Sequence, residues 1–481
     1  MKRIDVLPDD VLLDIFDFYM NMKPPYRQKE VDAWQTLVHV SRRWRCTVFR
    51  SPRRLNLRLY CTPKTPAKDA LDVWPALPLI VVGDLDISSG TNNIIAALGQ
   101  GNRVREVDLR LGGWQLKEIL KPMQVSFPEL TDLLLWSHYE TVSVIPIPDS
   151  FLDGSAPSLR SFSLRGISFP GLPKLLSSAT HLVRVDLKLG NIINLNSWCI
   201  SPEAMAASLS VLSSLELLVL GFQPPKSSPN WESRSLPPPK RSILPALRYF
   251  KFKGVAEYLE HIVTFIDAPQ LKTLDIIFFN QIDFDCPRLA QFIDCAPKLR
   301  ECDEAHVQFN NDTASVKLRY RTSVHYDFND LQINFPCREP DRQLSSTQRV
   351  CNSYLHPLSM VEDLYIDNVY SKLENWEDNA IENTLWLQLL LPFTGVKNLH
   401  ISQKLGPGIA AALQELVGGR AAEVLPSLQN MSVWIPSPLG RFRENIAQFL
   451  TARRLSGQPV TASVTNEVFW NWFEEEEEEE R

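Results

Sequence analysis

From about residue 80 onward, apolar residues recur in one short pattern. An apolar position is followed by two variable positions, a second apolar position, one variable position and a third apolar position. The last two apolar positions are two residues apart, so they point to the same face of a short strand. One such strand cannot bury its apolar face alone, but stacked copies bury it against one another. The copies begin at Val82, Val104, Leu130, Leu159, Leu182, Leu215, Leu247, Leu271, Val361, Val396 and Leu428.

The spacing of these copies predicts a solenoid. From Val104 to Leu271, successive copies begin 26, 29, 23, 33, 32 and 24 residues apart, close to the period of about 20–29 residues in leucine-rich repeats. We therefore expect an α/β fold with parallel strands on the concave side and helices outside. One helix begins with Ser201 as N-cap and Pro202 as first residue. The others are expected over 116–120, 172–177, 259–266, 287–293, 385–391 and 410–417.

Two stretches depart from this pattern. Over 307–309, 315–320 and 331–335 apolar residues alternate with a period of two. This predicts an irregular insert of longer strands near 303–335, with a local hairpin, and a helix over 345–354. Residues 223–240 are rich in Pro and Ser and predict an exposed loop.

Ahead of the repeats, two segments show the spacing of amphipathic helices. The first follows Leu7 and Pro8, and its acidic residues Asp9 and Asp10 favour the positive end of a helix. The second begins near Trp34. In each segment, apolar residues recur at intervals of three or four. They are Leu12, Ile15, Phe16 and Tyr19 in the first segment, and Leu37, Val40, Trp44 and Val48 in the second.

These patterns predict five parts. A helical head covers 1–60, and a linker covers 61–79. The solenoid runs over 80–458, and an aromatic cap over 459–473 follows it. The chain ends in an acidic tail, 474–481, which we expect to be disordered because like charges repel.

Composition narrows the class of protein further. The chain has 481 residues, of which 44% are hydrophobic and 22% charged, as in ordinary globular proteins. Its net charge is −6, but the run Glu474–Glu480 supplies seven negative charges, and without it the charge is +1. A nearly neutral body does not indicate nucleic-acid binding. No apolar stretch reaches the roughly 18 residues of a membrane span.

The residues that usually carry chemistry are scattered. The eight cysteines form no Cys-x-x-Cys pair, and the spacing of Cys286, Cys295, Cys302 and His306 matches no common zinc site. Phosphate-binding loops, nucleophile elbows and His-Glu-x-x-His motifs are missing from the sequence. We therefore expect no enzyme, no metal and no cofactor. The cysteine pattern and the charged N-terminus predict the cytoplasm and/or the nucleus.

Two segments of the head form a recognisable helical motif. They are Leu7-Pro8-Asp9-Asp10-Val11-Leu12-Leu13-Asp14-Ile15-Phe16 and Leu37-Val38-His39-Val40-Ser41-Arg42-Arg43-Trp44-Arg45. These segments resemble the F-box, the helical motif that binds the Skp adaptor of cullin–RING ubiquitin ligases. With the repeats behind it, the chain is similar to F-box proteins with degenerate leucine-rich repeats, which include large fungal families. Residues 20–31 make the connection between the segments longer than in the usual F-box.

The resemblance implies a substrate-recognition subunit of an SCF-type E3 ubiquitin ligase. Its partners would be a Skp-type adaptor, through it the cullin–RING ligase, and an unknown target protein. Some of the matching residues can instead form the core of the head. By position in the motif, the adaptor contacts are Leu7, Pro8, Leu12, Ile15, Phe16, Leu37, Val40 and Trp44.

Other features of the surface have two interpretations. The arginines between 42 and 58 are interpreted as a solvated face beside an acidic partner, because no aromatic stacking platform accompanies them. Aromatic residues near strand ends can anchor a target, or they can fill gaps between repeats. The candidates for target contact are Trp136, Tyr139, Phe222, Phe279 and Trp434.

A second function remains open from the sequence. The chain can be a plain leucine-rich-repeat interaction scaffold, unconnected with a ubiquitin ligase, whose F-box-like head only caps the first repeat. Binding of a purified Skp-type adaptor distinguishes the two functions.

Overall fold

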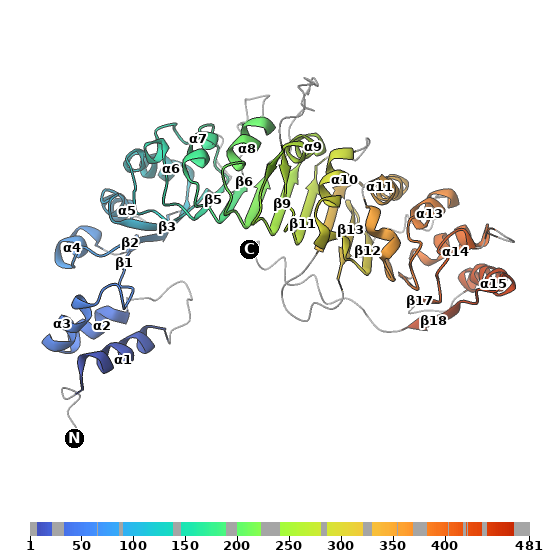
Figure 1. Cartoon of the computed structure of the whole chain (residues 1–481), viewed down its shortest axis with the longest axis horizontal. Helices are drawn as coiled ribbons and strands as arrows, with labels where there is room; N and C mark the ends of the chain where they lie inside the picture. The colour runs from blue at the N-terminus through green and yellow to red at the C-terminus, as the bar shows by residue number, and fades with distance from the viewer. Residues whose placement is uncertain are drawn as a thin grey trace. The chain divides into compact units, whose positions relative to one another are not determined.

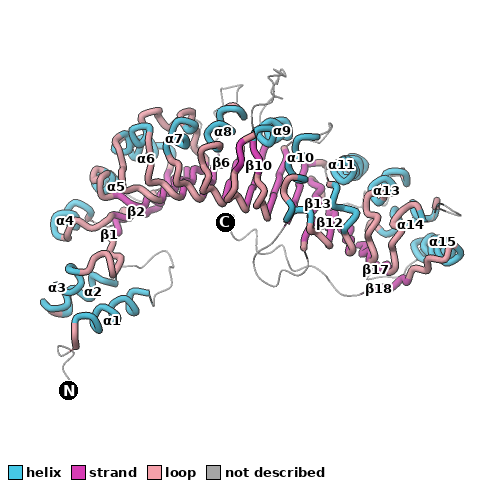
Figure 2. Tube along the Cα trace, viewed as in Figure 1, coloured by secondary structure: helices cyan, strands magenta, loops and turns pink. Residues whose placement is uncertain are grey.

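The computed structural model describes residues 7–21, 33–64, 66–85, 90–137, 146–188, 200–222, 241–279, 286–320, 330–353, 355–368, 382–402, 404–416, 420, 422–434 and 440–465. Two compact units divide the chain, Met1–Ser214 and Leu215–Arg481. Each unit contains a sheet that is wholly or mostly parallel, with helices along one side of it (Figures 1 and 2). The expected α/β class with strand–helix repeats is confirmed.

The first unit opens with three helices and continues into a parallel sheet in chain order, β1 to β6. The opening helices are α1 (Asp9–Asn21), α2 (Ala33–Val40) and α3 (Arg42–Arg50). The strands are β1 (Leu59–Cys61), β2 (Leu79–Asp84), β3 (Val104–Leu111), β4 (Asp132–Ser137), β5 (Ser161–Arg165) and β6 (Arg184–Lys188). The further helices are α4 (Ala67–Val73), α5 (Thr91–Leu98), α6 (Gly113–Leu120), α7 (Leu172–Ser178) and α8 (Pro202–Leu209).

The repeated apolar pattern determines which residues pair across this sheet. Leu109, Leu135, Leu164 and Leu187, each the third apolar position of its copy, are partners on successive strands. All four are buried under the helices, as is Val104 at the start of its copy. Burying each such side chain contributes about 1.5–3 kcal/mol, so the pattern accounts for the core.

One prediction for the start of the solenoid is wrong. The copy that begins at Val82 overlaps the end of β2, whose apolar run packs between β1 and β3, and its last apolar position, Ile87, lies outside the described residues. Residues 61–79 are not a linker, since β1 pairs in parallel with β2 and α4 follows β1. The segment is a strand–helix unit whose strand is too short for the pattern to appear.

The second unit contains a longer sheet in the order β7-β9-β11-β14-β13-β12-β15-β16-β17-β18. A separate parallel pair consists of β8 (Ser242–Ile243) and β10 (Ile266–Asp267). The helices are α9 (Ala256–Phe265), α10 (Pro287–Asp294), α11 (Pro340–Ser353), α13 (Asn383–Leu390), α14 (Gly406–Gln414) and α15 (Gly440–Leu455). The strands are β7 (Leu217–Gly221), β9 (Tyr249–Gly254), β11 (Thr273–Phe278), β12 (Glu304–Phe309), β13 (Thr313–Arg319), β14 (Asp330–Pro336), β15 (Asp363–Asn368), β16 (Asn398–Ser402), β17 (Asn430–Trp434) and β18 (Thr461–Thr465).

The region of the predicted irregular insert contains β12, β13 and β14. A tight turn, in which the backbone N–H of Asn310 donates to the carbonyl of Thr313 (2.8 Å), joins β12 to β13 in an antiparallel hairpin. β13 also pairs antiparallel with β14. Two reversals restore the strand direction, so β14 continues parallel to β11 and β12 continues parallel to β15. The insert is therefore part of the sheet rather than an appendage.

The C-terminal part differs from the predicted cap. β18 pairs in parallel with β17, so the sheet continues through Thr465. Before it, α15 carries Arg453, whose buried guanidinium donates to the carbonyls of Pro426 (3.3 Å) and Leu428 (3.2 Å). The remaining residues of the cap, the acidic tail and the loop 223–240 lie outside the described residues.

Helix N-termini receive their hydrogen bonds in two ways. Ser201 caps α8 as predicted, accepting from the backbone N–H of Ala204 (3.2 Å). The N-terminus of α10 is instead capped by Glu260 on α9, which accepts from the backbone N–H groups of Arg288 (2.5 Å) and Leu289 (2.9 Å). Desolvation by burial raises the pKa of Glu260, and these two hydrogen bonds oppose that rise.

Replacing Glu260 by alanine is expected to destabilise the second unit by about 1 kcal/mol, because two N–H groups at a helix start lose their acceptor. Urea unfolding measures the difference. Glu301→Ala, at an exposed position, is the matched control and should change stability by less than about 0.5 kcal/mol. Equal effects of the two substitutions would contradict the cap.

Cysteine burial predicts a reactivity pattern. Burial raises the pKa of Cys302 to about 12 and also raises the pKa of Cys351, and the thiolate is the reactive form. Cys46 and Cys295 are exposed. We expect iodoacetamide to modify Cys46 and Cys295 in the native protein, and Cys302 and Cys351 only after unfolding, as read by peptide mass spectrometry. Rapid native labelling of Cys351 would contradict the fold around α11.

Candidate functional site

The head contains three helices where the sequence predicted two. Ser41 ends α2 and caps α3, because its hydroxyl accepts a hydrogen bond from the backbone N–H of Trp44 (3.2 Å). A serine that can cap a new helix also competes with the continuation of the old one. Val40 and Trp44 therefore lie on different helices, and the prediction of one continuous apolar face through both is wrong.

The core of the head takes three of the eight residues predicted to contact the adaptor. Leu12, Phe16 and Leu37 are buried. The ring of Phe16 packs against half-buried Trp44, with centroids 4.8 Å apart. A side chain in a packed core cannot contact a partner while that core stays intact. We therefore correct the role of Leu12, Phe16 and Leu37 to formation of the head's own core.

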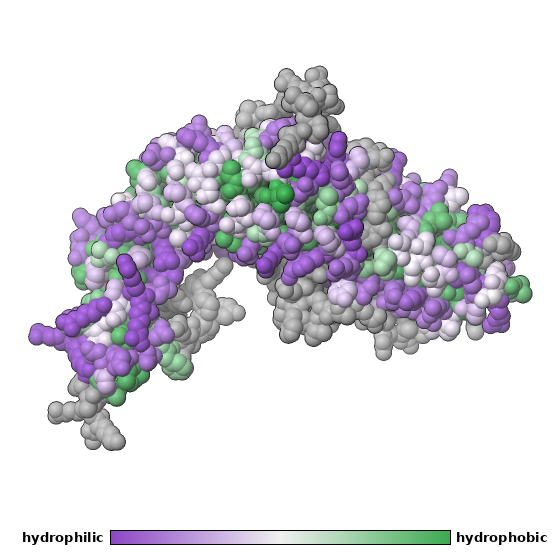
Figure 3. Space-filling view, in the orientation of Figure 1, coloured by the Kyte–Doolittle hydropathy of each residue, from purple (hydrophilic) through white to green (hydrophobic). Residues whose placement is uncertain are grey.

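An apolar stripe remains exposed on α1. Val11, Ile15 and Phe18 are spaced as neighbours along one helix face, and their exposed fractions are 38%, 45% and 67%. Val40, at the end of α2, is 57% exposed. Apolar atoms are visible on the head beside α1 in Figure 3. Grouped apolar exposure of this kind marks interaction sites, whereas single exposed residues do not.

The stripe agrees only partly with the predicted adaptor residues. Ile15, Val40 and Pro8 are exposed, and Leu7 and Trp44 are half-buried. Sequence reasoning missed Val11 and Phe18. Their spacing is also helical, since Val11, Ile15 and Phe18 repeat every three or four residues. The overlapping stripe that includes Leu12 and Phe16 has the same period, so periodicity alone does not tell which stripe forms the core.

The arginines on and after α3 stabilise the head rather than forming a basic patch. Arg43 pairs with Asp9 (2.7 Å) and also donates to the carbonyl of Leu7, which fixes α3 against the start of α1. Arg54 pairs with Asp14 on α1. Arg45 donates to the carbonyl of Val38 (3.0 Å). Most of these groups are exposed, so each pair contributes less than about 1 kcal/mol, and together they orient the three helices.

The head is also packed onto the first repeat. The indole N–H of Trp34 donates to the carbonyl of Arg58 (2.8 Å). The ring of Trp34 meets Trp74, just after α4, edge to face with centroids 5.0 Å apart, and Phe49 completes the group. Arg58 pairs with Glu106 on β3, whose pKa is raised by burial. The head is therefore anchored by α2 and α3, on residues other than the α1 stripe.

The helix-free face of the first sheet carries the first target candidate, Trp136. Cross-strand register places Trp136 between Arg110 and Arg165. Their guanidinium carbons lie 4.7 and 6.0 Å from the centre of the indole ring, within cation–π distance. Arg165 also pairs with Asp186 (2.8 Å). Trp136 is half-buried in this row.

The other target candidates have different outcomes. Phe222 is buried, with its ring 4.6 Å from that of Tyr258 on α9, so its predicted target contact is wrong because it fills the gap between repeats. Phe279, directly after β11, is half-buried. Tyr139 and the side chain of Trp434 lie outside the described residues.

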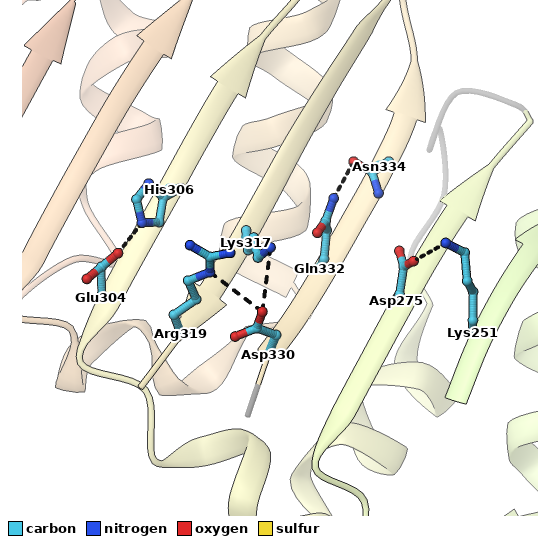
Figure 4. A network of polar contacts seen from close by, with 9 residues as sticks. All are labelled: Lys251, Asp275, Glu304, His306, Lys317, Arg319, Asp330, Gln332 and Asn334. Atoms are coloured by element: carbon cyan, nitrogen blue, oxygen red, sulfur yellow. Dashed lines mark hydrogen bonds and ion pairs between the residues drawn. The ribbon is translucent and has the colours of Figure 1, made fainter. Parts of the chain in front are cut away.

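The helix-free face of the second sheet is polar across many strands. Figure 4 shows the part that spans β9, β11, β14, β13 and β12, where polar side chains lie in rows set by strand register. Lys251 pairs with Asp275 (2.8 Å), and Asp330 lies 3.5 Å from both Lys317 and Arg319. Cross-strand pairs of this kind each stabilise a sheet by about 0.2–1 kcal/mol. On β11 and β14 the carboxylates pair with cations of neighbouring strands.

The same face continues as a stack of three rings. His306 on β12, Tyr365 on β15 and His400 on β16 are partners in register. Adjacent ring centres are 4.6 and 4.3 Å apart, and each pair of ring planes differs by 8°. Burial lowers the pKa of His306, although its hydrogen bond with Glu304 opposes this. We call these three residues the ring ridge.

Carboxylates and amides lie on both sides of the ring ridge. Two residues before it, the side-chain amide of Asn430 donates to Asn398 (2.8 Å), which donates to Asp363 (2.7 Å). Two residues after it lies Asp367, which accepts from the backbone N–H of Asn368 (2.8 Å). Burial raises the pKa of Asp367.

Two further properties concern only the part of the chain that the structure describes. There, no group of three or more His, Cys, Asp or Glu side chains is arranged to hold a metal ion. Within the same residues, no helix combines the length and apolar character that a membrane crossing requires.

No protein-family model matches the sequence, and no curated protein sequence matches it. Among solved structures, one similar chain is the leucine-rich repeat-containing protein LegL7 from Legionella pneumophila. It shares 13% sequence identity at a TM-score of 0.27, over 84% of this chain and 99% of that chain. The repeat architecture of the present chain follows from its own strand register and helix placement.

Proposed function

We propose that the chain is a non-catalytic adaptor that recruits a target protein to an SCF-type (cullin–RING) E3 ubiquitin ligase. In this proposal the head binds a Skp-type adaptor and the helix-free sheet faces hold the target. The observation that carries the proposal is the exposed stripe of Val11, Ile15 and Phe18 on α1. The head completes its core without these side chains, so they remain accessible to a partner.

The mechanism in this proposal is proximity. Holding a target lysine near a ubiquitin donor raises its effective concentration, and the chemistry belongs to the ubiquitin-conjugating enzyme elsewhere in the complex. The cytoplasm and/or the nucleus is the proposed place of action. The sequence resemblance to the F-box supports this role for the head.

The packing of Trp34 against Trp74 favours a second function, in which the head only caps the first repeat of an interaction scaffold. Mixing the full chain with a purified Skp-type adaptor and measuring binding by calorimetry distinguishes the two. A saturable complex supports the ligase adaptor, and lack of binding supports the scaffold.

A further inference from the structure

A row of cations crosses the helix-free face of the first sheet, near the carboxyl ends of its strands. Strand register aligns Arg110 on β3, Trp136 on β4, Arg165 on β5 and Lys188 on β6. We call these four residues the cationic row. All four are half-buried, so part of each side chain remains accessible to a partner. On β2 the row ends at Asp84, which is exposed and is the partner of Arg110 in register.

Trp136 holds two guanidinium groups on this face. The guanidinium carbon of Arg110 lies 4.7 Å from the centre of the indole ring, and that of Arg165 lies 6.0 Å from it. A cation–π contact uses the charge of a guanidinium and leaves N–H groups for other acceptors. Arg165 directs two of its donors at one carboxylate oxygen of Asp186 (2.8 and 3.3 Å). Within the part of the chain that the structure describes, Arg110 forms no ion pair.

These residue types favour a binding surface. Trp and Arg are the side chains that most often supply the binding energy of protein interfaces. A half-buried guanidinium without a carboxylate partner attracts an added carboxylate more strongly than a fully hydrated one, because the local dielectric constant is lower. The contact with Trp136 also orders the Arg110 side chain in advance, so less entropy is lost on binding. The complementary group is therefore an anionic side chain placed against Arg110.

The carboxylates behind the row favour a peptide over a nucleic acid. Asp108 and Asp186 lie two residues before Arg110 and Lys188, and therefore on the same face of the sheet. They confine the attraction for anions to one narrow row. Nucleic-acid binding depends on the neutralisation of many phosphates over a wide surface. An extended peptide instead presents side chains on one side at intervals of roughly 7 Å, and it can place carboxylates along a single row.

We propose that the cationic row binds an extended segment of a target protein that bears aspartate or glutamate side chains. One carboxylate binds Arg110, and others lie toward Arg165 and Lys188. The planar guanidinium of Arg110 suits this role because it can bind a carboxylate through two parallel hydrogen bonds. Trp136 acts by positioning the two arginines. This inference deepens the proposed function, on which it rests for the identity of the bound segment as part of a ligase target.

The test uses the full chain and a fluorescein-labelled octapeptide of alternating glutamate and serine, followed by fluorescence anisotropy. The parent chain should bind this peptide and not its lysine–serine counterpart. Arg110→Gln should bind about tenfold more weakly, because a charge-assisted contact is lost. Arg184→Gln is the matched control and should bind as the parent does, since Arg184 is exposed on the same face of β6 but lies outside the row.

Two further variants separate charge from positioning. Arg110→Lys keeps the charge and loses the planar fork, so it should retain only part of the affinity. Trp136→Leu removes no charge, yet it should weaken binding because both guanidinium groups lose the ring that orders them. Circular dichroism checks that each variant is folded. Arg110→Gln leaves no carboxylate without its partner, so it should fold as the parent does.

Several results would overturn the inference. Equal affinity of the parent and Arg110→Gln would do so, as would equal losses in Arg110→Gln and Arg184→Gln. Tighter binding of an oligothymidylate of the same length would indicate a nucleic-acid site. Peptide binding only by a chain that ends at Phe473 would indicate that the run Glu474–Glu480 occupies the row. Binding of the Skp-type adaptor is measured on the same samples and should be unchanged in Arg110→Gln, so failure of the target site and failure of the ligase function give different results.

Discussion

Replacing Ile15 and Phe18 together by aspartate is expected to lower the affinity for a Skp-type adaptor at least about a hundredfold. Each apolar side chain that an interface buries contributes about 1.5–3 kcal/mol. A carboxylate placed in the same apolar contact adds a desolvation cost. Calorimetry with the purified adaptor and the full chain measures the loss.

The double variant should still fold, so a loss of adaptor binding can be assigned to the α1 stripe. Both side chains are exposed, and the head's core residues Leu12 and Phe16 are left in place, so the helices should remain folded by circular dichroism. Trp114→Asp is the control, since Trp114 is 65% exposed on α6, outside the head. Unchanged adaptor binding in the double variant would reject the α1 stripe as the contact.

Truncating Phe252 to alanine is expected to destabilise the second unit by about 3–5 kcal/mol. The side chain on β9 is fully buried and stacks on Tyr258 of α9, with ring centres 6.3 Å apart and planes differing by 16°. Phe222 contacts the same pair at 6.1 Å from Phe252. The substitution leaves a cavity between the sheet and its helix layer, which the neighbouring rings can fill only in part.

Hydrogen exchange read by mass spectrometry localises this effect. In a repeat architecture each unit contacts mainly its neighbours, so protection should fall most in β9, β11 and α9, and least in α15. Lys253→Ala, one residue away on the exposed face, should change protection by less than about 0.5 kcal/mol. Uniform loss over the whole chain in the Phe252 variant would contradict a modular solenoid.

Much of the solenoid could be predicted because its signal is local. A strand that buries one face needs apolar residues two apart, and the copies at Val104, Leu130 and Leu159 supply them. The helix beginning at Pro202 was readable for the same reason, since the hydroxyl of Ser201 accepts from the backbone N–H of Ala204 in its first turn. The unit formed by β1 and α4 was missed because its strand contains only Leu59–Cys61.

The candidate site was predicted less well, because exposure depends on contacts between distant segments. The apolar residues of the head were readable, but which of them face inward depends on how three helices meet. Phe222 and Trp136 both follow the last apolar position of a strand pattern. Phe222 is two residues after Leu220, on the buried face, and packs against α9, whereas Trp136 is one residue after Leu135, on the opposite face, in an open row.

By itself, the sequence determined that strands and helices alternate, that they stack as a solenoid, and that an apolar helical head precedes them. These follow from periodicity and capping, which act between residues close together in the chain. Only the tertiary structure decided that the insert joins the sheet, that Val11, Ile15 and Phe18 stay exposed, and that His306, Tyr365 and His400 stack between carboxylate rows. Those arrangements join residues tens of positions apart through strand register and packing, which no local pattern records.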